Sequence, residues 1–407
     1  MNRPLRIQQT LQKFVDQGEL AGAATAVWRD GVLETACAGW QDIEAGIPIE
    51  RRHHLPHCLH VEAVDLVAAL MLLEEGKLAL EDPISRFAPE FTQMRVLRSA
   101  TGSLEDTEAC ERPITVADLL THRSGLTYGD FHRGPIAQAS REALGADIDS
   151  HRTPDDWIRR LAGLPLVGQP GSAMFYGQST DLLGFLIARI EGTSLGAVLH
   201  RRIFAAAGMK DTGFDVPPEH HQRRACAYGF DESGRLMKCN ERENIFAAHR
   251  PPGMSYESGG GGLWSTLDDY TRFARLFLGD GEVDGVRLLK PQTLAMMMSN
   301  QLTDEQRANS GWLGQKPFAA GLGFGLGVSV VLQTSPSDMM RRGSVGTVSW
   351  PGAFGGWWHA DPKENCVLVF LAHNMVDLAQ MGQGIGLGVW AAIEQFQTAA
   401  LGVEVAD

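Results

Sequence analysis

Two apolar segments near the start of the chain predict a β-hairpin. The segment "AGAATAVWRDGVLETACAGW" is interrupted only by Asp30-Gly31, a dipeptide that favours the two-residue turn of a hairpin. Four short apolar segments near the other end have turn residues between them, which is typical of further strands. These segments read "GLGFGLGVSVVL", "GSVGTVSW", "GGWWHADP" and "CVLVFLAH".

Helical periodicity occupies most of the chain between these strands. The segment "EAVDLVAALMLLEEG" predicts a helix that stops at Gly76, and "GLGVWAAIEQFQTAA" predicts one near the C-terminus. The first residues predict an amphipathic helix whose apolar face carries Leu5, Ile7, Leu11 and Phe14. Further helices are expected over residues 115–121, 179–192, 267–279 and 291–299.

Strands at both ends and helices between them predict an α+β protein. We expect the terminal strands to share one antiparallel sheet, flanked by helices, with a helical subdomain inserted between the two halves of the sheet. The expected organisation is a single domain over residues 1–407. Its sheet subdomain would comprise about 1–55 and 315–407, and its helical subdomain about 56–314.

Charge and hydropathy narrow the range of partners. The net charge of −13 comes without a run of basic residues, which argues against nucleic acid and anionic membranes as partners. The longest apolar run, "LVAALMLL", is too short to span a bilayer, and no apolar signal segment is seen at the N-terminus. Six scattered cysteines without a CxxC pair favour reduced, mostly buried thiols. We therefore expect a cytoplasmic location.

Seven segments, in order along nearly the whole chain, resemble one superfamily. The chain is similar to the class C β-lactamases and penicillin-binding proteins, and most similar to the family VIII esterases. The resemblance implies a β-lactamase-like fold acting on a small-molecule substrate. The segments are "LMLLEEGKLALEDPISRFAPEF", "ITVADLLTHRSGLTYG", "PGSAMFYGQSTDLLGFLIARIEGTSL", "FAAAGMKDTGF", "SGGGGLWSTLDDYTRFARLFLGDGEVDGVRLL", "GFGLGVSVV" and "GSVGTVSWPGAFGGWWHADPKENCVLVFLAHN".

The resemblance also implies a catalytic pattern, which this chain changes. Those relatives carry Ser-x-x-Lys, Tyr-x-Asn or a variant, and a third motif ending in glycine; the serine attacks a carbonyl while the lysine and tyrosine move its proton. Here Leu59 falls on the serine and Glu62 on the lysine, while Tyr176 keeps the tyrosine. Gln178 falls on the asparagine, and Trp350-Pro351-Gly352 on the third motif.

A leucine cannot act as a nucleophile, so the acyl-serine route is expected to be closed. None of the lysines has a serine three residues before it, so no displaced motif replaces it. The backbone N–H groups of Leu59 and Ala353 are expected to keep an oxyanion hole. Glu62 and Tyr176 are the expected acid–base pair, although Glu62 could instead pair with an arginine.

Other residues of the same region are weaker candidates. His60 and His359 are catalytic alternatives. Expected substrate-binding residues are Tyr128, Gln178, Trp350, Gly352 and Trp358. A cluster of possible metal ligands lies within thirteen residues: His53, His54, His57, Cys58, His60, Glu62 and Asp65. It lacks HExxH, and we expect its side chains to fan outward, so neither a metal nor a cofactor is predicted.

The main hypothesis is an enzyme that uses general acid–base catalysis on a carbonyl compound. Elimination, isomerisation, an aldol-type step or a cyclisation would all suit a carboxyl group facing an oxyanion hole. The alternatives are a hydrolase that uses activated water or another nucleophile, a catalytically silent binding protein, and metal-dependent chemistry.

Overall fold

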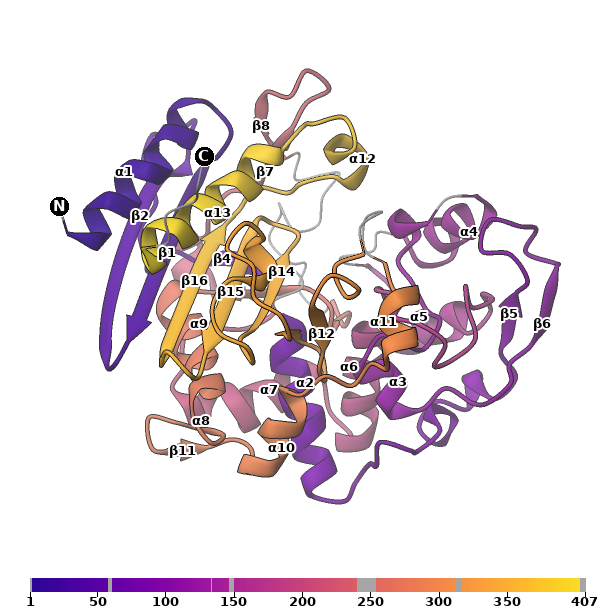
Figure 1. The fold of residues 1–407 in the computed structure, drawn as a ribbon. Coiled ribbons are helices and arrows are strands. Elements are labelled where there is room, and N and C mark those ends of the chain that lie inside the picture. The colour runs from indigo at the N-terminus through magenta and orange to yellow at the C-terminus, as the bar shows by residue number, and fades with distance from the viewer. Residues whose placement is uncertain are drawn as a thin grey trace.

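An eight-stranded antiparallel sheet joins the two ends of the chain (Figure 1). The computed structural model describes residues 2–57, 61–132, 134–145, 150–239, 254–311 and 316–402. The strand order is β12-β13-β14-β15-β16-β1-β2-β3, so C-terminal strands continue directly into N-terminal ones. This arrangement confirms the predicted α+β class with an antiparallel sheet. The division into two subdomains at the stated boundaries stays a prediction.

The strands of this sheet are short at its β12 edge and longest where the chain ends meet. They are β1 (Gly22–Arg29), β2 (Val32–Asp42), β3 (Ile47–Pro48), β12 (Leu322–Phe324), β13 (Ser329–Val331), β14 (Val348–Gly352), β15 (Gly356–Asp361) and β16 (Cys366–Ala372). Four two-stranded ribbons lie outside it: β4 (Leu55–His57) with β9 (Leu263–Ser265), β5 (Arg95–Leu97) with β6 (Thr107–Ala109), β7 (Tyr228–Phe230) with β8 (Leu236–Lys238), and β10 (Glu282–Val283) with β11 (Val286–Arg287).

Helices lie on both faces of the sheet and fill most of the chain between its two halves. The α-helices are α1 (Arg3–Asp16), α2 (Val61–Glu74), α3 (Val116–Leu120), α4 (Pro135–Leu144), α5 (Pro154–Leu161), α6 (Ser179–Glu191), α7 (Leu195–Leu199), α8 (Ala205–Ala207), α9 (Leu267–Ala274), α10 (Pro291–Met297), α11 (Asp304–Asn309), α12 (Leu378–Met381) and α13 (Leu387–Leu401). Short 3₁₀ segments include η3 (Gly129–Phe131), η5 (Pro218–Arg223) and η6 (Arg275–Leu278).

The predicted hairpin forms at Asp30-Gly31. Both residues have positive φ, 50° and 85°, as a turn that matches the twist of its strands requires. The hairpin strand β1 pairs with β16 over seven residues, from Ala23 opposite Ala372 to Arg29 opposite Cys366. α1 and α13 pack against one another beside this pairing (Figure 1). The N-terminal and C-terminal segments are therefore held together by both a strand pairing and a helix packing.

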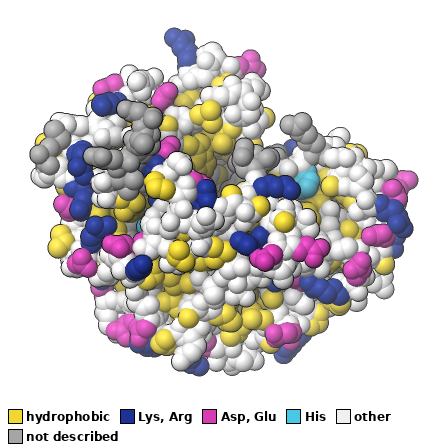
Figure 2. Space-filling view, in the orientation of Figure 1, with side chains coloured by type: hydrophobic (Ala, Val, Ile, Leu, Met, Phe, Trp, Pro, Cys, Tyr) yellow, Lys and Arg dark blue, Asp and Glu magenta, His cyan; other side chains and the backbone are white. Residues whose placement is uncertain are grey.

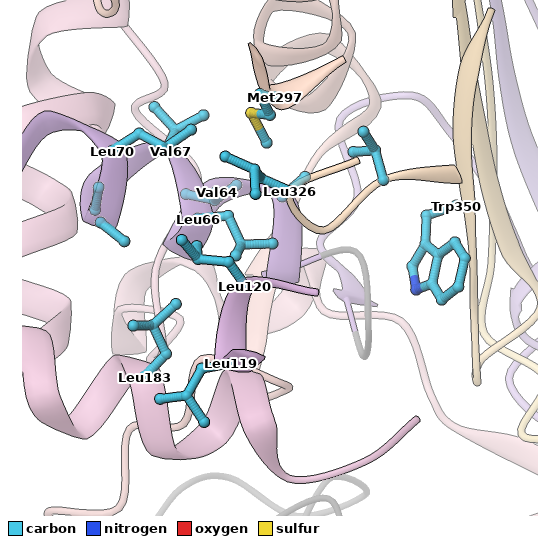
Figure 3. Packing of buried hydrophobic residues seen from close by; sticks show 14 of the residues in the cluster. Val64, Leu66, Val67, Leu70, Leu119, Leu120, Leu183, Met297, Leu326 and Trp350 are labelled. Carbon is cyan, nitrogen blue, oxygen red and sulfur yellow. The ribbon is translucent and has the colours of Figure 1, made fainter. Parts of the chain in front are cut away.

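The two faces of the sheet bury separate apolar clusters. One face carries Trp357 and Phe370 and is covered by α1 and α13 through Ile7, Leu11 and Phe396. The opposite face meets the helical part of the chain, where α2 is buried on nearly all sides. Figure 3 shows α2 side chains packed among residues of neighbouring helices and loops, with Trp350 projecting from β14 toward them. This second interface is where the candidate site forms.

Two sequence expectations need correction. Leu5 of α1 is 43% exposed, because its side chain falls outside the face that Ile7 and Leu11 bury. Of the described cysteines, all are free, but only Cys366 is buried; Cys37, Cys110, Cys226 and Cys239 are half-buried.

Helix length in the described residues does not favour a membrane span. No single helix there is both long and apolar enough to cross a bilayer. Taken together, Ser179–Glu191 and Leu195–Ala207 reach that length and composition, but they are bent by 75°. Both belong largely to the buried core.

Candidate active site

Glu62 and Tyr176 meet in the interior, between α2 and α6. Glu62 lies in the first turn of α2, and Tyr176 lies in the loop that leads into α6. The phenol of Tyr176 donates a hydrogen bond to Glu62 Oε1 at 2.9 Å, and the hydroxyl of Thr180 donates to the same oxygen at 2.8 Å. Glu62 is fully buried, and Tyr176 is 4% exposed. The described residues therefore give Glu62 hydroxyl partners and no arginine.

Burial sets the protonation state of Glu62. Desolvation raises the pKa of its carboxyl well above the usual range, and the nearby charge of Asp181 acts in the same direction. The hydroxyls of Thr180 and Tyr176 and the indole of Trp350 oppose this shift by favouring the charged form. Desolvation has the largest effect, so this carboxyl group keeps its proton to a higher pH than an exposed glutamate does.

His122 adds a buried imidazole ring to this centre. Its Nε2 lies 3.6 Å from Glu62 Oε1, and its ring centroid lies 4.6 Å from that of Tyr176. Burial lowers the pKa of His122 to about 3, so its imidazole is neutral. A positive φ of 51° holds it in the left-handed region, which is uncommon outside glycine. Backbone strain of this kind persists where packing enforces it.

Several buried polar atoms in this centre lack hydrogen-bond partners within the described part of the chain. They are Oε2 of Glu62, both carboxyl oxygens of Asp65, and both ring nitrogens of His122. A buried polar group without a partner costs about 1–3 kcal/mol, and native proteins contain few of them. Their concentration around one hydrogen-bonded pair is typical of a site that a polar ligand completes.

A second carboxyl network lies beside the first. Asp181 of α6 accepts hydrogen bonds from Tyr128 Oη at 2.7 Å and from the hydroxyl of Ser258. Burial raises the pKa of Asp181 to about 6, despite those hydrogen bonds. Burial and Asp181 also raise the pKa of Asp65 well above its usual range. Three carboxyl groups, with Glu62, thus share one desolvated region.

An apolar cavity of about 420 Å³ adjoins the centre through Trp350. The indole of Trp350 lies 5.5 Å, centroid to centroid, from the ring of Tyr176, and both Trp350 and Pro351 line the cavity. Other lining residues are mostly apolar, among them Phe318, Met340 and Trp390. Figure 2 shows hydrophobic side chains gathered in a hollow on this face of the molecule. The cavity is large enough for a small molecule, and Trp350 separates it from Tyr176, which is not among the lining residues.

The expected substrate-binding residues are not all close to Tyr176. The ring centroid of Tyr128 lies 5.9 Å from that of Tyr176, but Tyr128 is buried and its hydroxyl donates a hydrogen bond to Asp181. Gln178 contacts Ser140 of α4 and lines a separate cavity of about 20 Å³. Trp358 is the cross-strand neighbour of Trp350, yet its ring packs on Phe277, 4.8 Å away.

The turn after β14 and the strand β15 hold the remaining candidates. Gly352 ends β14 opposite Gly356, and Ala353 follows it in the turn, packed near Phe354. His359 lies beside Trp357, on the sheet face covered by α1 and α13, whereas Trp350 lies on the other face. Strand alternation explains this placement, because neighbouring side chains point to opposite faces. The structure therefore does not bring His359 to Glu62.

Leu59 and His60 lie outside the described residues, so their expected roles remain predictions. Cys58 lies there as well. In the clustered segment of possible metal ligands, His53 Nδ1 accepts a hydrogen bond from the backbone N–H of Glu50 at 2.8 Å. His54 approaches Asp211 and His220 rather than Glu62. A metal centre built from the sequence cluster itself thus gains no support from the described side chains.

Sequence reasoning missed four residues of this centre. Thr180 and Asp181 follow Tyr176 by four and five residues, so the start of a helix after the tyrosine motif was a usable signal. His122 and Ser258 carried no spacing signal, since they come from loops far away in the sequence. Only the folded chain shows them together with Glu62 and Tyr128.

The sequence and the fold match a known family of proteins. The family model described as Beta-lactamase matches residues 7–383, and the chain belongs to that family. A protein of Mycobacterium tuberculosis called Protein Rv1367c is 42% identical over 374 residues, which cover 91% of this chain and 90% of that protein. Esterase EstB of Burkholderia gladioli is 29% identical, with coverage of 88% and 86%.

Solved structures agree on the fold. EstCE1, described as a hydrolase with promiscuous acyltransferase activity, superposes with a TM-score of 0.76 at 23% identity, covering 97% of this chain and 98% of its own. Simvastatin synthase (LovD) from Aspergillus terreus gives 0.76 at 22% identity, with 98% and 99% covered. The chain is therefore an enzyme with a β-lactamase fold, related to esterases and acyltransferases.

Proposed function

We propose that this enzyme converts a small carbonyl compound by general acid–base catalysis through Tyr176 and Glu62, without an acyl-serine intermediate. The observation that supports this most is the buried 2.9 Å hydrogen bond between Tyr176 Oη and Glu62 Oε1, at the place where relatives are expected to keep tyrosine and lysine. Leu59, at the expected serine position, offers no nucleophile.

The two side chains would have different roles, because Tyr176 is slightly exposed and Glu62 is fully buried. Tyr176 keeps a small exposed area and neighbours Trp350 of the apolar cavity, so its phenol would meet the substrate. Glu62 lies behind it and would turn its O–H toward the phenol, so that Tyr176 gives its own proton to the reacting atom while it accepts the proton of Glu62. The backbone N–H groups of Leu59 and Ala353 would stabilise the developing oxyanion. Elimination, isomerisation, aldol-type and cyclisation steps fit this arrangement.

Glu62→Gln and Tyr176→Phe test the pair. Positioned acid–base groups contribute on the order of 100- to 10,000-fold in rate, so each substitution should lower turnover at least about 100-fold while the melting temperature stays close to the parent's. Loss of the Glu62 proton should also make parental turnover fall as pH rises through the pKa of Glu62. A panel of carbonyl compounds, followed by product analysis, would supply the substrate.

Tyr256→Phe is the matched control. Tyr256 is equally buried but packs with Trp157 and Phe185, so its variant should keep parental turnover. A purely structural Glu62 would give the opposite pattern, with a lower melting temperature and an unchanged rate per folded molecule. If both site variants melt and turn over like the parent, the pair does not carry the reaction.

Ester hydrolysis is the second candidate, because relatives at 28–29% identity are named Esterase EstB and Lovastatin esterase. In this chain a water molecule activated beside the carboxyl group would replace the serine. Chromogenic short-chain esters separate the two proposals. Ester turnover that is abolished by Glu62→Gln would favour hydrolysis by water. Conversion of a non-ester carbonyl compound, with no turnover of any ester, would favour the first proposal.

A further inference from the structure

Two histidines and an aspartate converge at a surface away from the acid–base pair. His54 immediately precedes β4, Asp211 follows α8 in a turn, and His220 lies in η5. One candidate ligand atom from each side chain lies within 4.8 Å of the others. His54 Nε2 lies 3.6 Å from Asp211 Oδ1, and His220 Nδ1 lies 3.8 Å from that same oxygen.

These separations are too long for hydrogen bonds, which have N···O distances up to about 3.2 Å. They suit atoms that share an ion better. Two ligands at about 2.0–2.1 Å from a tetrahedral zinc ion stand about 3.3 Å apart, so each of the two nitrogen–oxygen separations lies within about half an ångström of that value. The rings of His54 and His220 are already stacked, 6.0 Å apart and 27° from parallel.

The side chain of His54 is buried beside Asp211. It is 2% exposed, and its Nδ1 has no hydrogen-bond partner in the described ranges. Its other ring nitrogen, Nε2, faces Asp211, and an imidazole nitrogen is a common metal ligand. Its backbone is held by hydrogen bonds to Arg223 O at 2.8 Å and from Ala225 N at 2.9 Å.

Asp211 and His220, the other two candidate ligands, are both partly exposed to solvent. Asp211 supplies a carboxylate oxygen that faces a nitrogen of each histidine. The side chains of Asp211 and His220 are 27% and 39% exposed, which leaves a route for an ion and room for water in a fourth position. Imidazole and carboxylate together are ligands that zinc accepts.

Arg223 disfavours a cation beside Asp211. Its guanidinium donates to both oxygens of Asp211 at 2.9 Å, and its positive charge repels a cation. The alternative is an ion-pair network that needs no metal. That network keeps both histidines beyond hydrogen-bond distance of Asp211, so it leaves their convergence on one carboxylate oxygen unexplained.

We propose that His54, Asp211 and His220 bind one zinc ion, with water in the remaining position. The ion would join η5 and the turn at Asp211 to the residue that precedes β4, and β4 leads toward α2 and Glu62. Its role would therefore be to fix the approach to the acid–base centre. The proposal does not depend on the reaction that the centre catalyses.

The test uses the full-length protein after removal of metals with a chelator. Titration with Co²⁺, a spectroscopic substitute for zinc, should give visible absorption bands that saturate at one ion per chain. His220→Ala should abolish the bands, and His200→Ala, which removes an exposed histidine elsewhere, should keep them. Zinc at about a hundredfold above its dissociation constant should raise the melting temperature of the parent by about 3 °C, and not that of His220→Ala.

Two results would overturn the proposal. One is a parent that shows no saturable cobalt bands and no zinc-dependent melting shift. The other is an identical cobalt spectrum and affinity in His220→Ala, which would place the ion elsewhere. Because His220 is a surface residue, its variant should fold, and unchanged far-ultraviolet circular dichroism would verify this. Asp211→Asn gives a second check, since it should weaken cobalt binding while retaining both histidines.

Discussion

Leu59 makes a prediction about covalent reagents. Penicillins and fluorophosphonates label enzymes of this superfamily through an activated serine, and a leucine side chain cannot be acylated or phosphonylated. The parent protein should therefore show no stoichiometric adduct on the peptide that spans residues 57–62. Intact-mass measurement followed by peptide mapping checks this. An adduct on that peptide would contradict the prediction and would implicate Cys58.

The same position allows a gain-of-function experiment. Leu59→Ser combined with Glu62→Lys would rebuild the nucleophile and its proton acceptor in a fold that retains Tyr176. The double variant should hydrolyse short chromogenic esters measurably faster than the parent, and it should accept the fluorophosphonate that the parent refuses. Each single substitution serves as a control and should remain inactive. A folded double variant with no gain on any ester would count against a retained oxyanion hole.

At the level of residues, the sequence could identify part of the candidate centre and no more. Glu62 and Tyr176 were found because family-like segments fix their register, and the structure places them in contact. His359 was a candidate because its strand borders the expected wall of the pocket, but strand alternation turns its side chain to the other face. The partners His122 and Ser258 come from loops, where sequence offers no periodicity to extrapolate.

At the level of elements, the loop before α6 controls where Tyr176 lies. Gly177 packs so tightly that a Cβ atom there would overlap the backbone of Thr127 and Tyr128. Gly177→Ala should therefore displace the loop, lower the free energy of unfolding by about 1–3 kcal/mol, and reduce turnover by moving the phenol. Denaturant unfolding and steady-state rates measure the two effects.

Gly213→Ala is the comparison for that substitution. A Cβ atom at Gly213 would find its nearest neighbour at 3.5 Å, an ordinary contact, and the residue has no positive φ. Its variant should unfold within about 0.5 kcal/mol of the parent. If Gly177→Ala behaves like Gly213→Ala in both measurements, the close packing around Tyr176 does not restrict the loop.

Hydrophobic periodicity predicted the helices and strands better than it predicted which of them pack or pair with one another. It located the hairpin at Asp30-Gly31 and the helix that stops at Gly76, because local backbone preferences decide both. It did not give the register of β1 on β16, which depends on side chains more than three hundred residues apart. Nor could it show that Gln178 faces α4 instead of the cavity beside Trp350.

At the level of the whole molecule, buried ionisable groups make stability depend on pH in two opposite ways. Folding lowers the pKa of His122 to about 3, and those of His54, His359 and His373 to about 4, so these groups cost stability as pH falls below about 6.5. Folding raises the pKa of Glu62, Asp65 and Asp181, so these carboxyl groups cost stability as pH rises above about 4.

Asp65→Asn isolates one contribution from this balance. The folded protein keeps Asp65 protonated while the unfolded chain releases the proton, so the parent loses up to about 1.4 kcal/mol of stability per pH unit between pH 5 and 7. Asparagine cannot ionise. The free energy of unfolding of the variant, relative to the parent, should therefore rise with pH over this interval. Urea titrations at several pH values check it, and a constant difference would mean that Asp65 is ionised in the folded protein.

The pairing of β1 with β16 constrains how the chain can fold during synthesis. β1 emerges from the ribosome early, but its partner on that side, residues 366–372, emerges only after most of the 407 residues. At about 5–20 residues per second, the hairpin of β1 and β2 waits roughly 15–70 seconds with an open edge. Unpaired edges recruit other strands, so a nascent chain is exposed to misassembly until its final strand arrives.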